Sequence, residues 1–400
     1  MMRLSVIFES SPFDRKGLFN AVHNRVRHLL ATGECTIDVY CVHSRDNALT
    51  RRLRHTPSVP SVDTVSIDGI TYRMIWYRFS MLDYALLEKL HVRPWLFGRF
   101  MASHVGVLKG YDAVIAHSFT GALFAHRAHE LYGVPYYVTW HGSDVHTHPW
   151  RVPVILEDTK AVMDAARCNF FVSKTLMKAS DKITVNARKE VLYNGVSEDF
   201  MEFAPAEKTA VRERYGLAPE DKVVAFVGNL VAVKNVMVLP ELFAKISAGF
   251  SECSGSLKFW IVGDGKLRAS LESAFSGSGF EQIRFFGNVP SADMPAIMNC
   301  VDLLVLPSLN EGLPLVCAEA LRCGANVVGS DVGGIAEVIG TDNVAPLGDG
   351  FTDALAAKAI DHLAARAGSD TVPVATSQPL SPDFSWPRTA ALELSSLKSV

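Results

Sequence analysis

The stretch VDLLVLPSLNEGLPLVCAEALRCGANVVGSDVGGIAEVIG, residues 301–340, decides the fold class of this chain. Residues 302–306 are a short apolar run of the kind that forms a buried parallel strand. Pro314 suits the first turn of a helix, and Gly324 follows the end of that helix. Residues 326–329 read as a second strand, after which a new helix begins. Strands that alternate with helices predict a parallel, doubly wound α/β sheet.

Two acidic residues of this stretch lie where a ligand would bind. Glu311 is in the loop at the carboxyl end of the first strand, and Glu319 is in the helix that follows. Open α/β sheets bind ligands at the carboxyl ends of their strands, and a helix N-terminus offers free N–H groups to an anion. Carboxylates suit hydroxyl groups, which donate hydrogen bonds to them. The pattern indicates a nucleotide sugar, with phosphate between two polyhydroxyl parts; the alternative is that Glu311 caps the helix and Glu319 is solvated.

The segment SLNEGLPLVCAEALRCGANVVGSDVGGIAEVI, residues 308–339, closely resembles the family 4 glycosyltransferases, which have the GT-B fold and retain anomeric configuration. The two acids separated by seven residues, the Gly-Leu-Pro that follows the first acid, and the later Gly-Gly-Ile-x-Glu all match the family pattern. The resemblance implies that Glu311 contacts the donor sugar and Glu319 the ribose hydroxyls. It also assigns Gly312 and Leu313 to the donor site.

The resemblance implies an α/β, GT-B architecture in which two Rossmann-like, doubly wound domains face each other across a cleft. We expect an acceptor-side domain over residues 1–200 and a nucleotide-sugar-binding domain over residues 201–382. The final residues, 383–400, would form a helix that crosses back to the N-terminal domain. The length of 400 residues is enough for two domains of ordinary size.

Further loops of the second domain match the family's donor site. Lys234 matches a lysine that normally holds the donor diphosphate, whereas Asn229 replaces a common arginine and so removes one positive charge. In the family, loops equivalent to Gly263-Asp264-Gly265 and Gly287-Asn288-Val289 flank the nucleobase. This resemblance assigns four further residues to the donor site: Gly263, Asp264, Gly287 and Val289.

Two features of the first half complete the candidate site. Two predicted strands end in histidine, His117 and His141, and should point these side chains at one crevice. The segment TWHGSDV resembles a family motif beside the reacting sugar, which implies that His141 lies near the donor. Gly17 precedes a predicted helix, where it would either bind a phosphate through its backbone or form a simple turn. The family usually has two adjacent glycines where this chain has Lys16-Gly17.

The net charge of −3 does not indicate a protein that binds nucleic acid, but the two halves of the chain differ in their net charge. Residues 1–200 hold 24 basic and 19 acidic side chains, +5, and residues 201–400 hold 15 and 23, −8. Four arginines, at 45, 51, 52 and 54, indicate one of two things: a solvated, charged loop, or a surface that binds an anionic acceptor. The apolar stretch at 95–100, flanked by Arg93 and containing Arg99, favours either core packing or contact with a membrane surface.

Seven scattered cysteines without a CxxC motif favour reduced thiols in the cytoplasm over disulfides or a zinc site. The N-terminal MMRLSVIFES contains Glu9, which ends its apolar run before it reaches the length that a signal peptide needs. No apolar run is long enough for a transmembrane helix. We therefore expect a cytoplasmic protein, with peripheral attachment at the inner face of the membrane as the alternative.

We predict a retaining hexosyltransferase that moves a sugar from a nucleotide-diphosphate sugar to an acceptor hydroxyl. The donor would be a UDP-sugar, with a GDP-sugar possible, and the acceptor a glycan or lipid-linked glycan in bacterial surface polysaccharide synthesis. Lys234, with helix N–H groups, would stabilise the leaving diphosphate, which would take the acceptor proton without any covalent nucleophile. No Asp-x-Asp motif appears in the site loops, so neither a metal nor a cofactor is expected.

Two alternatives remain open: an enzyme like a nucleotide-sugar 2-epimerase on the same fold, and a non-catalytic module that binds sugar nucleotides. The epimerase would turn over a nucleotide sugar with no acceptor added. The non-catalytic module is disfavoured because Glu311, Glu319, Lys234 and His141 are all present. The sequence leaves the oligomeric state and the identity of the sugar undetermined.

Overall fold

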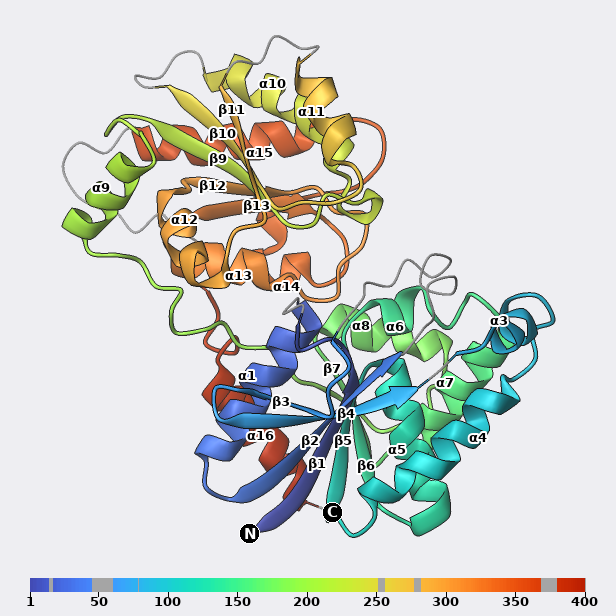
Figure 1. The fold of residues 1–400 in the computed structure, drawn as a ribbon. Helices are drawn as coiled ribbons and strands as arrows, with labels where there is room; N and C mark the ends of the chain where they lie inside the picture. The colour runs from blue at the N-terminus through green and yellow to red at the C-terminus, as the bar shows by residue number, and fades with distance from the viewer. Residues whose placement is uncertain are drawn as a thin grey trace. The chain divides into compact units, whose positions relative to one another are not determined.

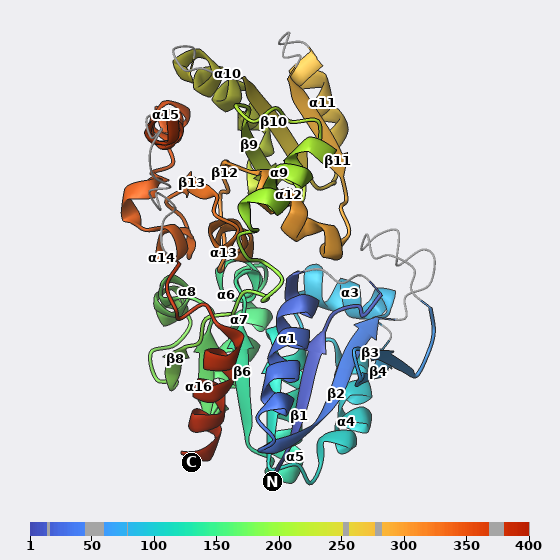
Figure 2. The same ribbon diagram turned by 90° about the vertical axis from the view of Figure 1, so that its left-hand side faces the viewer.

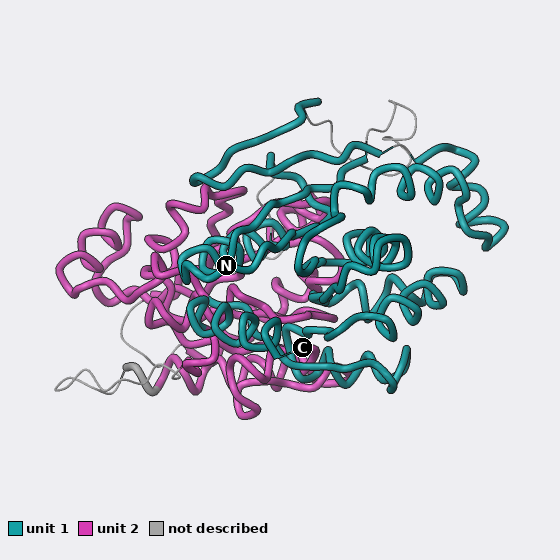
Figure 3. The backbone as a smooth tube through the Cα atoms, turned by 90° about the horizontal axis from the view of Figure 1, so that it is seen from below, with its two compact units in different colours: residues 1–195, 385–400 teal, residues 196–384 magenta. Residues whose placement is uncertain are grey.

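The computed structural model describes residues 1–13, 17–44, 60–77, 79–250, 256–276, 282–367 and 380–399. The chain forms two compact units, one of Met1–Gly195 with Ser385–Val400 and one of Val196–Phe384 (Figure 3). These boundaries lie a few residues from the expected ones. The backbone N–H of Val196 donates to the carbonyl oxygen of Phe384 at 3.2 Å, so the two connecting segments pair with each other inside unit 2.

The described residues of unit 1 form an eight-stranded sheet in the order β3-β4-β2-β1-β5-β6-β7-β8 (Figure 1). All neighbouring strands are parallel except β3 and β4, which form an antiparallel hairpin. The strands are β1 (Met2–Glu9), β2 (Cys35–Ser44), β3 (Thr64–Ile67), β4 (Ile70–Tyr77), β5 (Ala113–His117), β6 (Tyr136–Trp140), β7 (Cys168–Phe171) and β8 (Lys189–Val191). The helices are α1 (Gly17–Ala31), α3 (Met81–Glu88), α4 (Trp95–His104), α5 (Ser118–Tyr132), α6 (Ser143–His146), α7 (Pro153–Ala165), α8 (Lys174–Ala179) and α16 (Trp386–Lys398).

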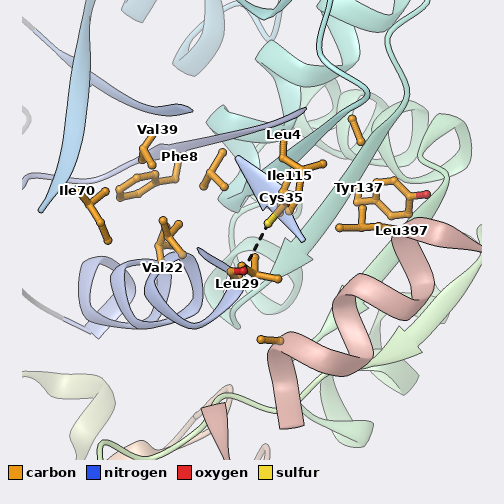
Figure 4. Packing of buried hydrophobic residues seen from close by; sticks show 14 of the residues in the cluster. Leu4, Phe8, Val22, Leu29, Cys35, Val39, Ile70, Ile115, Tyr137 and Leu397 are labelled. Carbon is orange, nitrogen blue, oxygen red and sulfur yellow. Dashed lines mark hydrogen bonds between the residues drawn. The ribbon is translucent and has the colours of Figure 1, made fainter. Parts of the chain in front are cut away.

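The core of unit 1 forms because β1 is an apolar run that is buried on both faces, as parallel strands are. Leu4 and Phe8 of β1 pack with Val22 and Leu29 of α1 (Figure 4). The thiol of Cys35 donates to the carbonyl oxygen of Leu29 at 3.4 Å and closes the end of this layer. Fully burying a leucine or phenylalanine contributes about 1.5–3 kcal/mol, so this layer is a principal source of stability.

The final helix, α16, is part of unit 1 although the chain reaches it from unit 2. It packs beside α1, as Figure 2 shows. Ala390, Leu394 and Leu397 are spaced along one helical face and are buried in the unit 1 core. This apolar face explains why the helix joins unit 1.

The described residues of unit 2 form a parallel sheet in the order β11-β10-β9-β12-β13-β14 (Figure 1). Numbered by their order within the unit, this is 3-2-1-4-5-6, the order of dinucleotide-binding sheets. The strands are β9 (Lys222–Val227), β10 (Leu257–Val262), β11 (Ile283–Gly287), β12 (Leu303–Leu306), β13 (Asn326–Ser330) and β14 (Val344–Ala345). The helices are α9 (Pro205–Arg214), α10 (Leu239–Phe250), α11 (Arg268–Ser276), α12 (Met294–Cys300), α13 (Leu315–Arg322), α14 (Ile335–Ile339) and α15 (Phe351–Ala367).

The apolar stretch at 95–100 is less buried than core packing would require. No residue of α4 is fully buried, and Trp95 is 51% exposed. Phe97 is half-buried and packs against Tyr77 and Phe124, with ring centroids 5.2 and 6.5 Å away. The core interpretation is therefore wrong for Trp95 and holds only in part for Phe97. The arginines at 45, 51, 52 and 54, the other basic feature of this half, lie outside the described residues.

Candidate active site

The candidate site of unit 2 begins at the point where its strand order reverses. Strands β9 and β12 are neighbours, and the chain continues from them to opposite sides of the sheet. Open α/β sheets bind ligands in the crevice outside such a switch point. Lys234 lies in the loop after β9 and Glu311 in the loop after β12, so the topology brings the two residues to this point.

Lys234 and Glu311 form an ion pair, with the ammonium Nζ and the carboxylate Oε1 2.5 Å apart. The Lys234 side chain is 21% exposed and that of Glu311 is 11% exposed. The Ser308 hydroxyl donates to the same carboxylate oxygen at 2.7 Å, and the N–H of Leu309 donates to the carbonyl oxygen of Val233 at 2.8 Å. An ammonium has three N–H donors, so Lys234 can hold Glu311 and still donate to a phosphate.

Glu319 lies on α13 and is half-buried. Burial raises the pKa of its carboxyl group to about 7. Hydroxyl groups that donate to a carboxylate favour its charged form, so a bound polyol would lower this pKa again. Unit 2 therefore holds one ion-paired acid, Glu311, and one acid, Glu319, whose pKa burial raises to about 7.

The loops around this switch point approach one another more closely than side chains would allow. A Cβ at Gly263, whose φ is +127°, would lie 2.0 Å from the carbonyl oxygen of Gly228. A Cβ at Gly333, whose φ is +54°, would lie 1.8 Å from the carbonyl oxygen of Glu311. Glycine is required at both positions, because backbone packs against backbone there. The Gly263 contact brings the loops after β9 and β10 together, and the Gly333 contact does the same for those after β12 and β13.

The other predicted donor-site residues of unit 2 lie in these loops or at the end of β11 and in the loop after it. Asp264 accepts from the N–H of Gly265 at 2.7 Å and pairs with Arg268 at 3.3 Å. The carbonyl oxygen of Gly287 accepts from the N–H of Gly263 at 2.8 Å, and that of Gly312 accepts from the N–H of Gly334 at 3.0 Å. The side chain of Asn229, in the loop after β9, is exposed. The side chains of Val289, after β11, and Leu313, after β12, are half-buried.

The two histidines predicted to converge lie together in unit 1. His117 Nδ1 and His141 Nε2 are 3.0 Å apart, which confirms the convergence. Burial, followed by the charge of Arg25, lowers the pKa of His141 to about 3 and that of His117 well below its ordinary value. Both imidazoles are therefore neutral at pH 7, and one donates to the other. The carboxylate of Asp144 accepts from the N–H of His141 and that of Gly142, which holds the loop after β6 in place.

Gly17 is the first residue of α1 and is exposed. Among the described atoms, nothing lies within 4 Å of the position that a Cβ would occupy there. The packing of the described residues therefore does not require glycine at this position, and its role in phosphate binding stays a prediction.

Sequence reasoning missed Arg25, which is buried in unit 1 and donates to Thr139 Oγ1 at 2.7 Å and Asn194 Oδ1 at 3.3 Å. Its signal is visible in the sequence, since Arg25 stands between Val22 and Val26 on the apolar face of a helix. A charged residue at such a position indicates a buried partner.

Two further observations concern metals and membranes. Within the described ranges, no group of three His, Cys, Asp or Glu side chains is placed to hold a metal ion. No helix in that same part of the chain has the length and apolar character needed to cross a bilayer.

Solved structures share this fold over nearly the whole chain. The Anabaena protein HepE in complex with UDP and glucose aligns with a TM-score of 0.67 at 16% identity, covering 99% of this chain and 100% of that one. Sucrose-phosphate synthase from Thermosynechococcus elongatus aligns with a TM-score of 0.68 at 15% identity, covering 99% and 95%. The two α/β sheets, one mostly and one wholly parallel, together with these neighbours define the fold as that of the GT-B glycosyltransferases.

Residues 221–365 match the family described as Glycosyl transferases group 1. The 2-deoxystreptamine glucosyltransferase of Streptomyces kanamyceticus is 30% identical over 227 residues, 53% of this chain and 57% of that protein. The D-inositol 3-phosphate glycosyltransferase of Salinispora arenicola is 27% identical over 330 residues, 74% and 72% of the two chains. The chain spans about half the length of the first of these relatives and of the teichuronic acid glycosyltransferase TuaC of Bacillus subtilis.

Proposed function

We propose that this protein is a family 4 glycosyltransferase that moves a sugar from a nucleotide-diphosphate sugar to an acceptor hydroxyl with retention of configuration. The ion pair of Lys234 and Glu311 at the switch point of unit 2 is the observation that carries the proposal. It joins a cation suited to a diphosphate with a carboxylate suited to sugar hydroxyls. Glu319, which titrates near pH 7, would accept from the ribose hydroxyls.

In the proposed reaction, the acceptor oxygen forms a bond to the anomeric carbon of the sugar. The bond between that carbon and the diphosphate oxygen breaks, and the acceptor proton leaves with the diphosphate. Lys234 and the loop N–H groups stabilise the negative charge that develops on the leaving oxygen. His141, held neutral by burial, would lie beside the reacting sugar and donate or accept a hydrogen bond without adding charge.

The named relatives support the choice of donor and pathway. HepE was solved with UDP and glucose, and TuaC is named as a teichuronic acid biosynthesis glycosyltransferase. We therefore favour a UDP-sugar over a GDP-sugar, and an acceptor that is a glycan or lipid-linked glycan of the bacterial surface. The enzyme would act in the cytoplasm, at the inner face of the membrane, without a metal or cofactor.

Thermal unfolding with UDP-, GDP- and ADP-glucose tests the donor. Ligand that binds the folded state adds about 2.7 kcal/mol of stability at one hundred times its Kd, so the preferred donor should raise Tm most. Release of UDP from UDP-glucose by the wild type and by Glu311→Gln then tests the site. Equal stability with and without every nucleotide sugar would contradict the proposal.

The measurement of UDP release also distinguishes the epimerase alternative. It would convert the nucleotide sugar with no acceptor present, whereas a transferase would release nucleotide diphosphate faster when an acceptor is added. A non-catalytic module would show the Tm shift and no turnover.

A further inference from the structure

The carboxylate of Glu311 is held by two groups of unit 2, and both of them use the same oxygen. The Lys234 ammonium lies 2.5 Å from Oε1, and the Ser308 hydroxyl donates to Oε1 at 2.7 Å. Among the described residues, no hydrogen bond or ion pair reaches the second oxygen, Oε2, which is not fully buried. Each carboxylate oxygen accepts through two lone pairs, so Oε1 is already used and Oε2 is left for a ligand.

Ser308 is itself anchored to the neighbouring strand. It is completely buried in the loop after β12, directly behind Pro307. Proline has no N–H that could continue the ladder from β12 to β13, which lie side by side in Figure 1. Beyond this point the hydroxyl of Ser330, the last residue of β13, donates to the carbonyl oxygen of Ser308. This bond extends the contact between the strands and limits how far the backbone of Ser308 can move.

The fold also fixes the backbone of Glu311 but leaves its side chain free to rotate. Gly333, in the loop after β13, packs so closely that a Cβ there would lie 1.8 Å from the carbonyl oxygen of Glu311. The bonds within the glutamate side chain have no such constraint. Among the described residues, the hydrogen bonds and ion pairs that hold its carboxylate come from Lys234 and Ser308.

Donor binding would change the part that Lys234 plays. The proposed function gives its ammonium a second task, which is to donate to the leaving diphosphate. Phosphate oxygens compete with Oε1 of Glu311 for the same nitrogen, and a lysine side chain is flexible enough to turn toward them. The Ser308 hydroxyl is uncharged, buried and on a short side chain, so a diphosphate would not draw it away from the carboxylate.

We propose that Ser308 is a positioning residue of the donor-sugar site: its hydroxyl holds Oε1 of Glu311, so that Oε2 stays directed at a sugar hydroxyl after Lys234 has turned to the diphosphate. A hydroxyl that donates to a carboxylate also stabilises its charged form, which would otherwise be disfavoured beside an anionic diphosphate. The words donor and sugar rest on the proposed function, whereas the bond between the serine and the glutamate does not.

The kinetics of UDP release from UDP-glucose separate positioning from binding. Ser308→Ala should lower kcat about tenfold or more, because a misplaced Glu311 loses contacts that matter in the transition state. KM for UDP-glucose should change less than about threefold, because Lys234 still binds the diphosphate. Ser180→Ala is the matched control and should change neither constant: Ser180 is equally buried and donates to the carbonyl oxygen of Met177 at 2.6 Å, but it lies in unit 1.

A double variant shows whether the serine acts through the glutamate. Glu311→Ala leaves no carboxylate to position, so adding Ser308→Ala to it should lower kcat further by less than about twofold. A loss of about tenfold in both backgrounds would mean that Ser308 acts on another group, and a Ser308→Ala enzyme with the kcat of the wild type would mean that it positions nothing. Either result would overturn the proposal.

The variants Ser308→Thr and Ser308→Val separate the hydroxyl from its packing. Both add bulk at a buried position and should lower Tm by similar amounts, but only threonine keeps the hydroxyl. The threonine variant should keep kcat within about threefold of the wild type, and the valine variant should lose as much as Ser308→Ala. Equal kcat values for the two would show that packing and not the hydroxyl matters. If the valine variant does not fold, Ser308→Ala supplies the comparison without the hydroxyl.

A crystal structure of the wild type with UDP tests the arrangement without turnover. Lys234 Nζ should lie within hydrogen-bond distance of the diphosphate, with Ser308 still bonded to Glu311; a hydroxyl that has left Oε1 in this complex would contradict the inference and leave the proposed function intact. Failure of UDP and UDP-glucose to bind would contradict the proposed function alone. Urea unfolding of the single and double variants of Ser308 and Glu311 then measures their coupling, and purely additive effects would rule it out.

Discussion

Arg25 of α1 and Glu393 of α16 form an ion pair, with Nε and Oε2 3.6 Å apart, and both side chains are almost completely buried. Burial lowers the pKa of Arg25 and raises the pKa of Glu393, and the charge of each partner opposes the shift of the other. Arg25 also donates to Thr139 of β6, the strand that leads to His141. The final helix is therefore tied through Arg25 to the strand that positions the candidate histidine.

Removing one member of this pair should destabilise unit 1. Glu393→Gln leaves the Arg25 charge buried without its partner, which typically costs about 3–5 kcal/mol. Glu34, which forms an exposed ion pair with Lys398 on the same helix, provides a control: Glu34→Gln should cost only about 0–1 kcal/mol. Urea unfolding measures both. A double variant, Arg25→Met with Glu393→Leu, removes both buried charges together with the Arg25 bonds to Thr139 and Asn194, so it should recover part of the loss. A Glu393→Gln variant as stable as the wild type would show that the pair contributes nothing.

The two acids of unit 2 should differ in their kinetic effects. Glu311→Gln removes a group proposed to act on the reacting sugar, so kcat should fall about 10²–10³-fold. Glu319→Gln should mainly raise KM for the donor, because the ribose is bound equally in the ground and transition states. Steady-state release of UDP measures both. Glu220→Gln, an exposed acid at the amino end of β9, is the matched control and should change neither constant.

Donor binding should depend on the protonation of Glu319. The pKa of this carboxyl group is raised to about 7, so it is neutral below that pH and a carboxylate above it. Only the carboxylate accepts hydrogen bonds from two ribose hydroxyls, so affinity for UDP-glucose should increase as the pH rises from 6 to 8. Glu319→Gln should bind more weakly and lose this dependence. A wild-type affinity that is flat across this range would exclude Glu319 from the donor site.

We expect chelation to leave turnover unchanged. Lys234 supplies the positive charge that a metal ion would otherwise bring to the diphosphate. Activity is measured after dialysis against EDTA, with and without added Mg²⁺ or Mn²⁺. Loss of turnover that either ion restores would show that the diphosphate is held by a metal.

Peripheral contact with a membrane is proposed from the outer surface of α3 and α4. Trp95 of α4 is 51% exposed, and Leu82 of α3 is 50% exposed. Liposome flotation should show binding that is weakened in the double variant Trp95→Ser with Leu82→Ser, because buried apolar area drives such binding. Leu131→Ser removes an exposed apolar residue from α5 instead and should leave flotation unchanged. Absence of the wild type from both anionic and neutral vesicles would favour a soluble acceptor.

The sequence alone determined where the strands of unit 2 end and which residues follow them. Apolar runs bounded by proline and glycine locate strands such as residues 222–227 and 303–306, because these signals act over a few neighbouring residues. The carboxyl ends of parallel strands share one edge of a sheet. Glu311 could therefore be placed at this edge before any distance was known, and the same reasoning paired His117 with His141. The resemblance to a family motif, and not the strand pattern, added Lys234 to the site.

Only the tertiary structure decided which charges are buried and what they touch. Arg25 and Glu393 are far apart in the sequence and meet because α16 packs on α1, and a cavity in unit 1 is lined by segments from Glu9 to Asp158. Burial and charge partners depend on packing between distant segments, and no local pattern contains that information. For the same reason, the pKa of Glu319 follows from the surroundings of α13 and not from its place in a motif.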